Sequence, residues 1–206
     1  GNEENLKVAV ENGADAVYLG MNKFSARAKA ENFSPEELRK AVKYCHEKGV
    51  RVYVTLNTLI KNKEVEEFFK LVEEVYVMGV DAIIIQELSF ASLIKKAFPD
   101  LEIHASTQAR IQNLKGLKNI DRVILPRELS KKEIEEIAKV GIPIEIFVQG
   151  ALCFSISGLC LMSSFIGGRS GNRGMCAQPC RKEYNNEYLM SMKDLSLINK
   201  IKEYKW

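Results

Sequence analysis

The stretch EKGVRVYVTL at residues 47–56 decides the fold. Its charged start and Gly49 predict the end of a helix, because a glycine just after a helix adopts a left-handed backbone conformation at little steric cost. The β-branched and apolar residues that follow predict a short strand covered on both faces. The same helix–glycine–strand unit recurs as ENGADAVYLG at 11–20, VMGVDAIIIQ at 77–86 and KVGIPIEIFV at 139–148, around Gly13, Gly79 and Gly141.

The remaining elements can be placed between these units. Ser34-Pro35-Glu36-Glu37 and Ser130-Lys131-Lys132-Glu133 each have the form of a capping box, which marks a helix start. Helices are predicted at about 34–48, 63–78, 88–97 and 131–140, with two more at about 2–11 and 195–204. Additional strands are predicted at about 102–105 and 122–125.

Strands that alternate with helices predict an α/β fold made of parallel βαβ units. Such units form either a TIM-type (β/α) barrel or an open, doubly wound sheet. The 206 residues are enough for one domain, but they fall short of the roughly 250 residues of a full barrel. Periodicity leaves both arrangements open; our prediction is a single domain over residues 1–206 with a TIM-barrel-like (β/α) fold, which need not be complete in this chain.

Composition indicates a globular protein without membrane spans. The chain is 46% hydrophobic and 28% charged, and its formal net charge of +3 identifies no polyanionic partner by itself. Neither a signal peptide nor an apolar run of about eighteen residues is recognisable. We therefore expect a cytoplasmic protein, in which stable disulfides are disfavoured.

Four of the five cysteines lie in the segment 150–181, which we call the cysteine segment. Six, fifteen and three residues separate its thiols, which are Cys153, Cys160, Cys176 and Cys180. In a reducing compartment such a group is more typical of a metal site than of disulfides. A structural zinc ion and an iron–sulfur cluster both use thiolates, but the C-x-x-C pairs usual for zinc are absent. Cys45 lies in a predicted helix and is interpreted as a small buried hydrophobe.

Polar residues follow several of the predicted strands. In parallel α/β folds the functional site forms at the carboxyl ends of the strands. The residues expected at that edge are Asn57, Gln86, His104, Gln108, Arg127 and Glu128. The cysteine segment follows the EIFV strand, which ends at Val148, so we expect it on the same face.

The cysteine segment also carries a resemblance to a known family. Residues 145–163 resemble the signature E-x-F-x-x-G-x-x-C-x-x-x-x-G-x-C-x-x-S of the collagenase-like peptidase family U32, through Glu145, Phe147, Gly150, Cys153, Gly158, Cys160 and Ser163. The motifs ADAVYLG, VYVTLN, IHASTQ, RVILPREL and SMKDLSL occur in the order that the family shows. The family's usual histidine is replaced by Gln149, and its first strand and its downstream Lys-Ile-Glu-Gly-Arg strand have no counterpart, which suggests a fragment.

The resemblance implies an enzyme that hydroxylates RNA without oxygen. The stretch GGRSGNRGMCAQPCR is most similar to the branch that hydroxylates a cytidine of large-subunit ribosomal RNA, and a sister branch acts on the wobble uridine of tRNA. Members bind a 4Fe-4S cluster, and prephenate is the implied source of the hydroxyl group. The four clustered cysteines would then be the cluster ligands, in preference to a zinc site.

The resemblance and the residue types together suggest roles for the other candidates. His104 could move a proton during attack on the pyrimidine ring, with a satisfied core histidine as the alternative. Arg127 could bind a carboxylated co-substrate that Glu128 orients. Arg169 and Arg173 could contact RNA, or could only balance the charge of the cluster. Asn57, Gln86 and Gln108 are candidate hydrogen-bonding groups for substrate, and Phe24 among cations could stack on a base.

Two other classes of function remain open. The family name suggests a peptidase, although the chain contains neither H-E-x-x-H nor G-x-S-x-G. A non-catalytic iron–sulfur protein that assembles with another subunit is the second alternative. RNA is the expected partner, and a protein partner or a homo-oligomer is compatible with the sequence.

Overall fold

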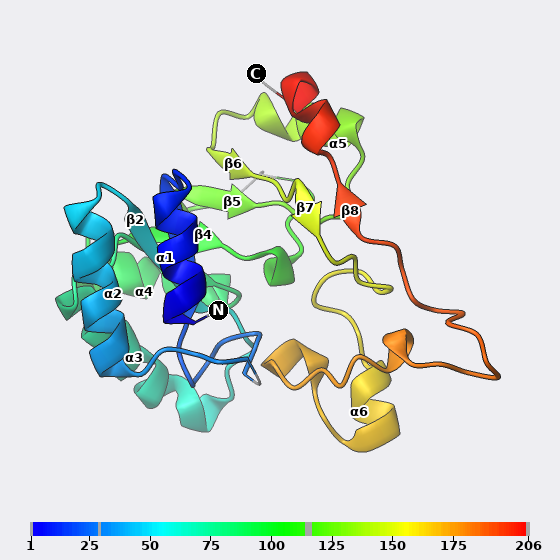
Figure 1. Ribbon diagram of the computed structural model, residues 1–206. Helices are drawn as coiled ribbons and strands as arrows, with labels where there is room; N and C mark the ends of the chain where they lie inside the picture. Colours follow the sequence, from blue (N-terminus) through cyan, green and yellow to red (C-terminus); the bar gives the residue numbers. More distant parts are fainter. Residues whose placement is uncertain (1, 29, 114–116, 205–206) are drawn as a thin grey trace.

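The computed structural model describes residues 2–28, 30–113 and 117–204. In this part of the chain six parallel strands form one sheet in the order β1-β2-β3-β4-β5-β6, which is also their order in the sequence (Figure 1). A doubly wound sheet reverses its strand order at a switch point, whereas a barrel does not. The sheet is therefore a curled half-barrel, as expected for an incomplete TIM-barrel-like fold. The strands are Ala16–Gly20, Arg51–Leu56, Ala82–Ile85, Glu102–Ala105, Arg122–Ile124 and Ile144–Glu145.

Helices connect most of these strands. The α-helices are α1 (Glu3–Glu11), α2 (Pro35–Glu47), α3 (Val65–Val77), α4 (Ala91–Ala97), α5 (Lys131–Ala138) and α6 (Met162–Gly167). Both predicted capping boxes are present, at Ser34 with Glu37 and at Ser130 with Glu133. The four predicted helix-ending glycines have positive φ angles, between 71° and 87°. None of the helices in the described residues is long and apolar enough to cross a lipid bilayer.

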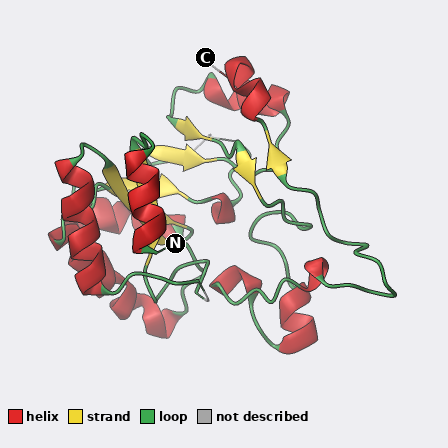
Figure 2. Cartoon of the chain, viewed as in Figure 1, coloured by secondary structure: helices red, strands yellow, loops and turns green. Residues whose placement is uncertain are grey.

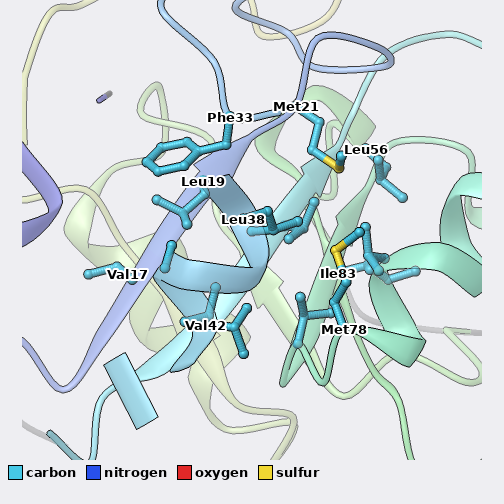
Figure 3. Close-up of a cluster of buried hydrophobic side chains, with 14 of the residues drawn as sticks. Val17, Leu19, Met21, Phe33, Leu38, Val42, Leu56, Met78 and Ile83 are labelled. Carbon is cyan, nitrogen blue, oxygen red and sulfur yellow. The ribbon is translucent and has the colours of Figure 1, made fainter. Parts of the chain in front are cut away.

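The two faces of the sheet have different surroundings. On the outer face, side chains such as Val54 and Ile83 pack with those of the helices into the main hydrophobic core (Figure 3). Cys45 of α2 is fully buried in this core, as predicted. On the inner face, Tyr53 and Ile84 belong to a smaller cluster that Phe147 contacts. The inner face is partly open, because Tyr18 has 51% of its surface exposed.

The end of the described chain differs from the prediction. The predicted helix at 195–204 is wrong: Leu195–Ser196 forms β8, and a 3₁₀ helix follows at Ile198–Tyr204. The strand predicted after Gly141, in the unit at 139–148, is also shorter, since β6 ends at Glu145 and β7 covers Gln149–Gly150. The physical reason is pairing between distant segments. β7 pairs antiparallel with β8, and the Leu197 N–H donates to the Val148 carbonyl at 2.7 Å.

This pairing defines the geometry of the cysteine segment. β7 lies at its start and β8 lies after its end, so the backbone from β7 to β8 is a long loop whose two ends are joined by this strand pair. We call residues 151–194 the excursion. Figure 2 shows that the excursion is mostly loop, with α6 as its main helix. In Figure 1, α6 lies away from the sheet, below the edge where β7 leaves it. The excursion therefore needs side-chain and backbone contacts to hold it against the half-barrel.

Candidate functional site

The loops at the carboxyl ends of the first strands are joined by one amide side chain. Asn57 follows β2, and its Oδ1 accepts a hydrogen bond from the Ala26 N–H at 2.9 Å. Its Nδ2 donates to Ser106 Oγ, after β4, at 3.2 Å. Ser106 Oγ also accepts from the Gln108 N–H at 3.2 Å. Asn57 therefore links three loops, and a role in binding substrate stays a prediction.

Gln86 and Gln108 lie together at the same edge. Gln86 Nε2 donates to the Gln108 carbonyl at 3.3 Å, which fixes the orientation of the Gln86 amide because the reverse orientation would place two oxygens together. The Oε1 atoms of both glutamines are buried, and neither has a hydrogen-bond partner among the described residues. Unpaired buried acceptors are costly, so both oxygens are suited to a donor from a bound molecule.

Arg127 follows β5 and is stacked on an aromatic ring. Its guanidinium carbon lies 3.6 Å from the centre of the Phe147 ring. Burial lowers the pKa of Arg127, while the Cys153 sulfur and the Glu128 carboxylate oppose that shift, so both groups are within electrostatic reach. Its Nε is buried without a partner in the described part of the chain. A half-buried cation with a free donor is suited to bind an anionic group.

Glu128 faces the cysteine segment instead. Its two carboxylate oxygens accept hydrogen bonds from the Ser157 N–H at 2.8 Å and from Ser157 Oγ at 3.1 Å. Gly158 packs closely against the loop after β4. A Cβ at this position would lie only 2.4 Å from the Gln108 carbonyl oxygen. Ser157 and Gly158 thus fix the part of the segment between Cys153 and Cys160 against the ends of β4 and β5.

The four thiols of the cysteine segment are all free. Burial raises the pKa of Cys180, and the Cys153 and Cys176 thiols raise it further, so three sulfurs are electrostatically coupled. A Cβ on Gly171 would lie 3.6 Å from Cys176 Cβ and 3.8 Å from the Cys160 carbonyl oxygen. The segment thus brings its cysteines into one region. Among residues 2–28, 30–113 and 117–204, no three His, Cys, Asp or Glu side chains converge as ligands of a single ion.

Arg173 connects the segment to the loop after β2. Its Nη1 and Nη2 donate to the two carboxylate oxygens of Glu64 at 2.9 and 2.6 Å, and Nη1 also donates to the Leu59 carbonyl at 2.6 Å. The Leu59 N–H donates in turn to the Asn172 carbonyl at 3.3 Å. The Arg173 hydrogen bonds, and after them the Lys61 N–H, lower the pKa of Glu64 to about 2. In this structure the guanidinium thus stabilises the fold, and its predicted contact with substrate stays a prediction.

A second glycine permits close packing beside Arg173. Gly174 has φ 76°, and a Cβ there would lie 2.3 Å from the Ser25 carbonyl oxygen in the loop after β1. Arg181, at the end of the segment, donates to the Leu152 carbonyl at 3.1 Å. The cysteine segment therefore contacts the loops after β1, β2, β4 and β5.

His104 lies deeper than the other predicted residues. It is fully buried on β4, paired in register with Ile84, and its ring meets Tyr53 edge-on at 4.7 Å between centroids. Burial lowers the pKa of His104, although Nε2 lies 3.1 Å from a Glu102 carboxylate oxygen. The imidazole is therefore neutral near pH 7. His104 lies within β4, whereas Ser106 follows the end of that strand. The structure therefore does not bring His104 to the carboxyl edge that carries Asn57 and Gln86.

Sequence reasoning misses two residues that shape this site, Glu64 and Ser157, because each has an ordinary residue type for a helix start or a loop. Glu64 could have been suspected, because it lies near the strand end that carries Asn57. Phe24 was singled out for base stacking, but its ring packs edge-on against the buried Phe68 at 5.7 Å. The backbone at Phe24 is left-handed, with φ 57°, and one edge of the ring packs against the core, while stacking of a base on this ring stays a prediction.

We predict that Gly174→Ala displaces the cysteine segment whereas Gly168→Ala does not. Both glycines have positive φ, so each substitution costs about 1 kcal/mol of backbone strain. Only at Gly174 would the new methyl group also meet backbone, at the Ser25 carbonyl. Limited proteolysis should therefore cut segment 150–181 faster in Gly174→Ala than in Gly168→Ala. Equal cleavage of the two variants would contradict the docking described above.

We also predict that Glu64→Gln lowers stability at neutral pH but not in acid. A carboxylate whose folded pKa is about 2, below the ordinary 4.5, stabilises the fold above pH 4.5 and loses that effect as the pH falls towards 2. Urea unfolding of wild type and variant at several pH values should show two curves that converge in acid. Glu66→Gln, which removes an exposed pair with Lys70, is the control and should have a smaller effect.

Sequence similarity to known proteins extends over most of this chain. The profile of peptidase family U32 matches residues 1–205. The tRNA hydroxylation protein P1 of Bacillus subtilis is 35% identical over 227 aligned residues, which cover 98% of this chain and 53% of the relative. The 23S rRNA 5-hydroxycytidine C2501 synthase of Escherichia coli is 37% identical over 203 aligned residues, covering 90% of this chain and 30% of the relative. The chain thus spans about half the length of its curated relatives, or less.

A solved structure agrees with the fold. The U32 peptidase Mk0906 superposes with a TM-score of 0.63 at 12% sequence identity, over 94% of this chain and 82% of that chain. At this identity the likeness concerns the fold alone. The match of the profile over residues 1–205 shows that the chain belongs to peptidase family U32.

Proposed function

We propose that this chain takes part in the oxygen-independent hydroxylation of a pyrimidine base in RNA. The single observation that carries the proposal is a segment with four free thiols, three of them electrostatically coupled, next to a half-buried arginine at the carboxyl edge of a half-barrel. Relatives named for hydroxylation of tRNA and for synthesis of 5-hydroxycytidine in 23S rRNA support RNA as the substrate. A cytosolic location is part of the same proposal.

The thiols fit a 4Fe-4S cluster by number and by chemistry. Each iron of such a cluster takes one protein ligand, so four thiolates around a common region suffice and need not converge on one ion. The electrostatic coupling of Cys180 to Cys153 and Cys176 supports such a region. We therefore infer that Cys153, Cys160, Cys176 and Cys180 would hold the cluster. Bound there, it would supply electron transfer or Lewis acidity to the reaction.

The neighbouring residues would tune and position these ligands. The Gln178 N–H donates to Cys176 Sγ at 3.3 Å. Hydrogen bonds to ligand sulfurs are one means by which a protein sets the reduction potential of a cluster. Gln178 reaches this position through a left-handed backbone, with φ 53°, a strained conformation of a kind that clusters at functional sites.

Arg127 is the residue that we assign to the co-substrate. Prephenate, the proposed source of the hydroxyl group, carries carboxylates, and a guanidinium binds a carboxylate through directed hydrogen bonds. The free buried Nε of Arg127 supports this assignment. Glu128 would position the co-substrate indirectly, because its carboxylate holds Ser157 of the cysteine segment. The unpaired Oε1 atoms of Gln86 and Gln108 would accept hydrogen bonds from bound substrate.

Iron and sulfide analysis tests the cluster. Protein purified under nitrogen should contain about four irons and four sulfides per chain, and Cys176→Ser should lose most of both. Cys45→Ala serves as the control, because Cys45 is buried in α2 far from the segment in sequence, and it should keep its iron. Zinc in place of iron, or four freely titrating thiols and no metal, would overturn the cluster and with it the hydroxylation.

Nucleoside analysis tests the reaction. RNA from a strain lacking the protein should lack one pyrimidine nucleoside that is heavier by one oxygen, and the wild-type gene should restore it. Arg127→Gln should fail to restore it, since the variant keeps a polar side chain but loses the positive charge and the forked donors of the guanidinium. An unchanged nucleoside profile together with cleavage of unfolded protein would favour a peptidase. A cluster with neither activity and a stably bound subunit would favour an assembly role.

A further inference from the structure

One aromatic side chain is far more exposed than the others. Phe165 of α6 has 87% of its surface exposed, more than any other large hydrophobic side chain in the described part of the chain. Aromatic side chains normally bury most of their surface, so an exposed one suggests a binding contact. Phe165 takes no part in the site described above.

The exposure of Phe165 is imposed by the way α6 is held. Ser163 on the opposite side of the helix is buried, and its Oγ accepts a hydrogen bond from the Ala177 N–H at 2.9 Å. The Ser163 carbonyl accepts from the Arg169 N–H at 3.3 Å, after Gly168 ends the helix in a left-handed conformation. Contacts at both ends of the helix therefore fix its orientation, and they turn Phe165 outward.

Uncompensated positive charge lies next to this helix. A cavity of about 520 Å³ separates the loops after β1 and β2 from the residues that follow α6. Two of its four cations are neutralised, because Lys23 pairs with Glu67 and Arg173 pairs with Glu64. The other two, Lys61 and Arg169, form no ion pair with any described residue. The cavity is therefore suited to hold negative charge.

Arg169 links the cavity to the helix that carries Phe165. A Cβ on Gly167 would lie 3.8 Å from Arg169 Nε and 3.9 Å from its Nη2. The guanidinium thus lies over the last turn of α6, four residues after Phe165. An exposed aromatic ring and an unpaired guanidinium on one rigid turn form the combination that binds single-stranded nucleic acid, by stacking on a base and by contacting phosphate.

We propose that α6 and the adjacent cavity bind a single-stranded part of the RNA, with Phe165 stacked on an unpaired base and with Arg169 and Lys61 on the phosphates. This inference rests on the proposed function for its substrate class. The unpaired cations favour RNA over a protein partner, because a purely apolar interface would leave them beside an uncharged surface. The contact lies outside the cysteine ligands, so it would select and orient the RNA and not take part in the reaction.

The test measures binding of a fluorescein-labelled, single-stranded 12-nucleotide RNA of mixed sequence to the protein purified under nitrogen. Phe165→Leu keeps the apolar character but removes the ring, and should weaken binding by about tenfold or more. Phe165→Trp should bind within about twofold of wild type, because it keeps a stacking surface. Val77→Ala, at an exposed apolar residue of α3, is the control and should bind like wild type.

Salt dependence separates the two kinds of contact. Arg169→Gln should reduce the slope of log affinity against log salt by about 0.7, as expected for one lost phosphate contact on a single strand. Phe165→Leu should lower affinity without changing that slope. Lys61→Gln should behave like Arg169→Gln, while a slope unchanged in both variants would overturn the phosphate contacts.

The outcomes also distinguish this inference from the proposed function. If the wild-type protein restores the hydroxylated nucleoside in cells and Phe165→Leu binds RNA as tightly as wild type, only the stacking contact is overturned. If Phe165→Leu instead changes the oligomeric state, measured by light scattering, while RNA affinity is kept, the patch is a protein interface and the inference is wrong. If wild-type protein neither binds the probe nor restores the nucleoside, the proposed function fails first.

Discussion

The parallel order of the strands is the constraint on which the rest of the structure depends. Because β1 to β6 are all parallel, their carboxyl ends lie along one edge, and the loop after each strand starts there. Asn57 joins the loops after β1, β2 and β4 through two hydrogen bonds. These hydrogen bonds fix the loops at the carboxyl edge, and the mostly irregular cysteine segment packs against them.

The cysteine segment is held by backbone proximity more than by apolar packing. Gly158 and Gly174 allow the segment to approach the Gln108 and Ser25 carbonyls so closely that a methyl group would not fit. The bidentate pair of Arg173 with Glu64 adds a charged contact between the segment and the residues that follow β2. Several large apolar side chains of the segment stay exposed, Phe154, Leu161 and Phe165 among them. A segment fixed in this way can present both thiols and an aromatic ring at defined positions.

The family name and the chemistry of the site point in different directions. Family U32 was named for peptidases, yet within the described residues the site has neither an ordered nucleophile–histidine pair nor a single-ion ligand set. His104 is neutral, buried and one layer below the edge, so it is poorly placed to activate a thiol of the cysteine segment. A fold of this kind supports many chemistries, and function has to be argued from the site. Here the four thiols and the half-buried Arg127 are the features on which the proposed hydroxylation rests.

Sequence periodicity and glycine placement determined most of the fold. Gly13, Gly49, Gly79 and Gly141 end helices as predicted, because their left-handed conformation depends only on local sterics. The capping boxes are equally local, and the resemblance to family U32 rests on one short signature together with motifs that follow in the family's order along the chain. The choice between a barrel and a doubly wound sheet needed the strand order, which no local pattern contains.

What only the tertiary structure decided depends on contacts between residues distant in sequence. Leu195 and Ser196 form β8 because β7 offers backbone partners to them, although the pattern of residues 195–204 favours a helix, and a 3₁₀ helix begins only at Ile198. Phe24 turned into the core beside Phe68, and Phe165 was turned outward by the buried Ser163. Arg173 met Glu64, 109 residues away, and so stabilises the fold. The sequence alone determined which chemical groups the protein has, whereas the packing of distant backbone segments decided which of them are paired, buried or free to bind.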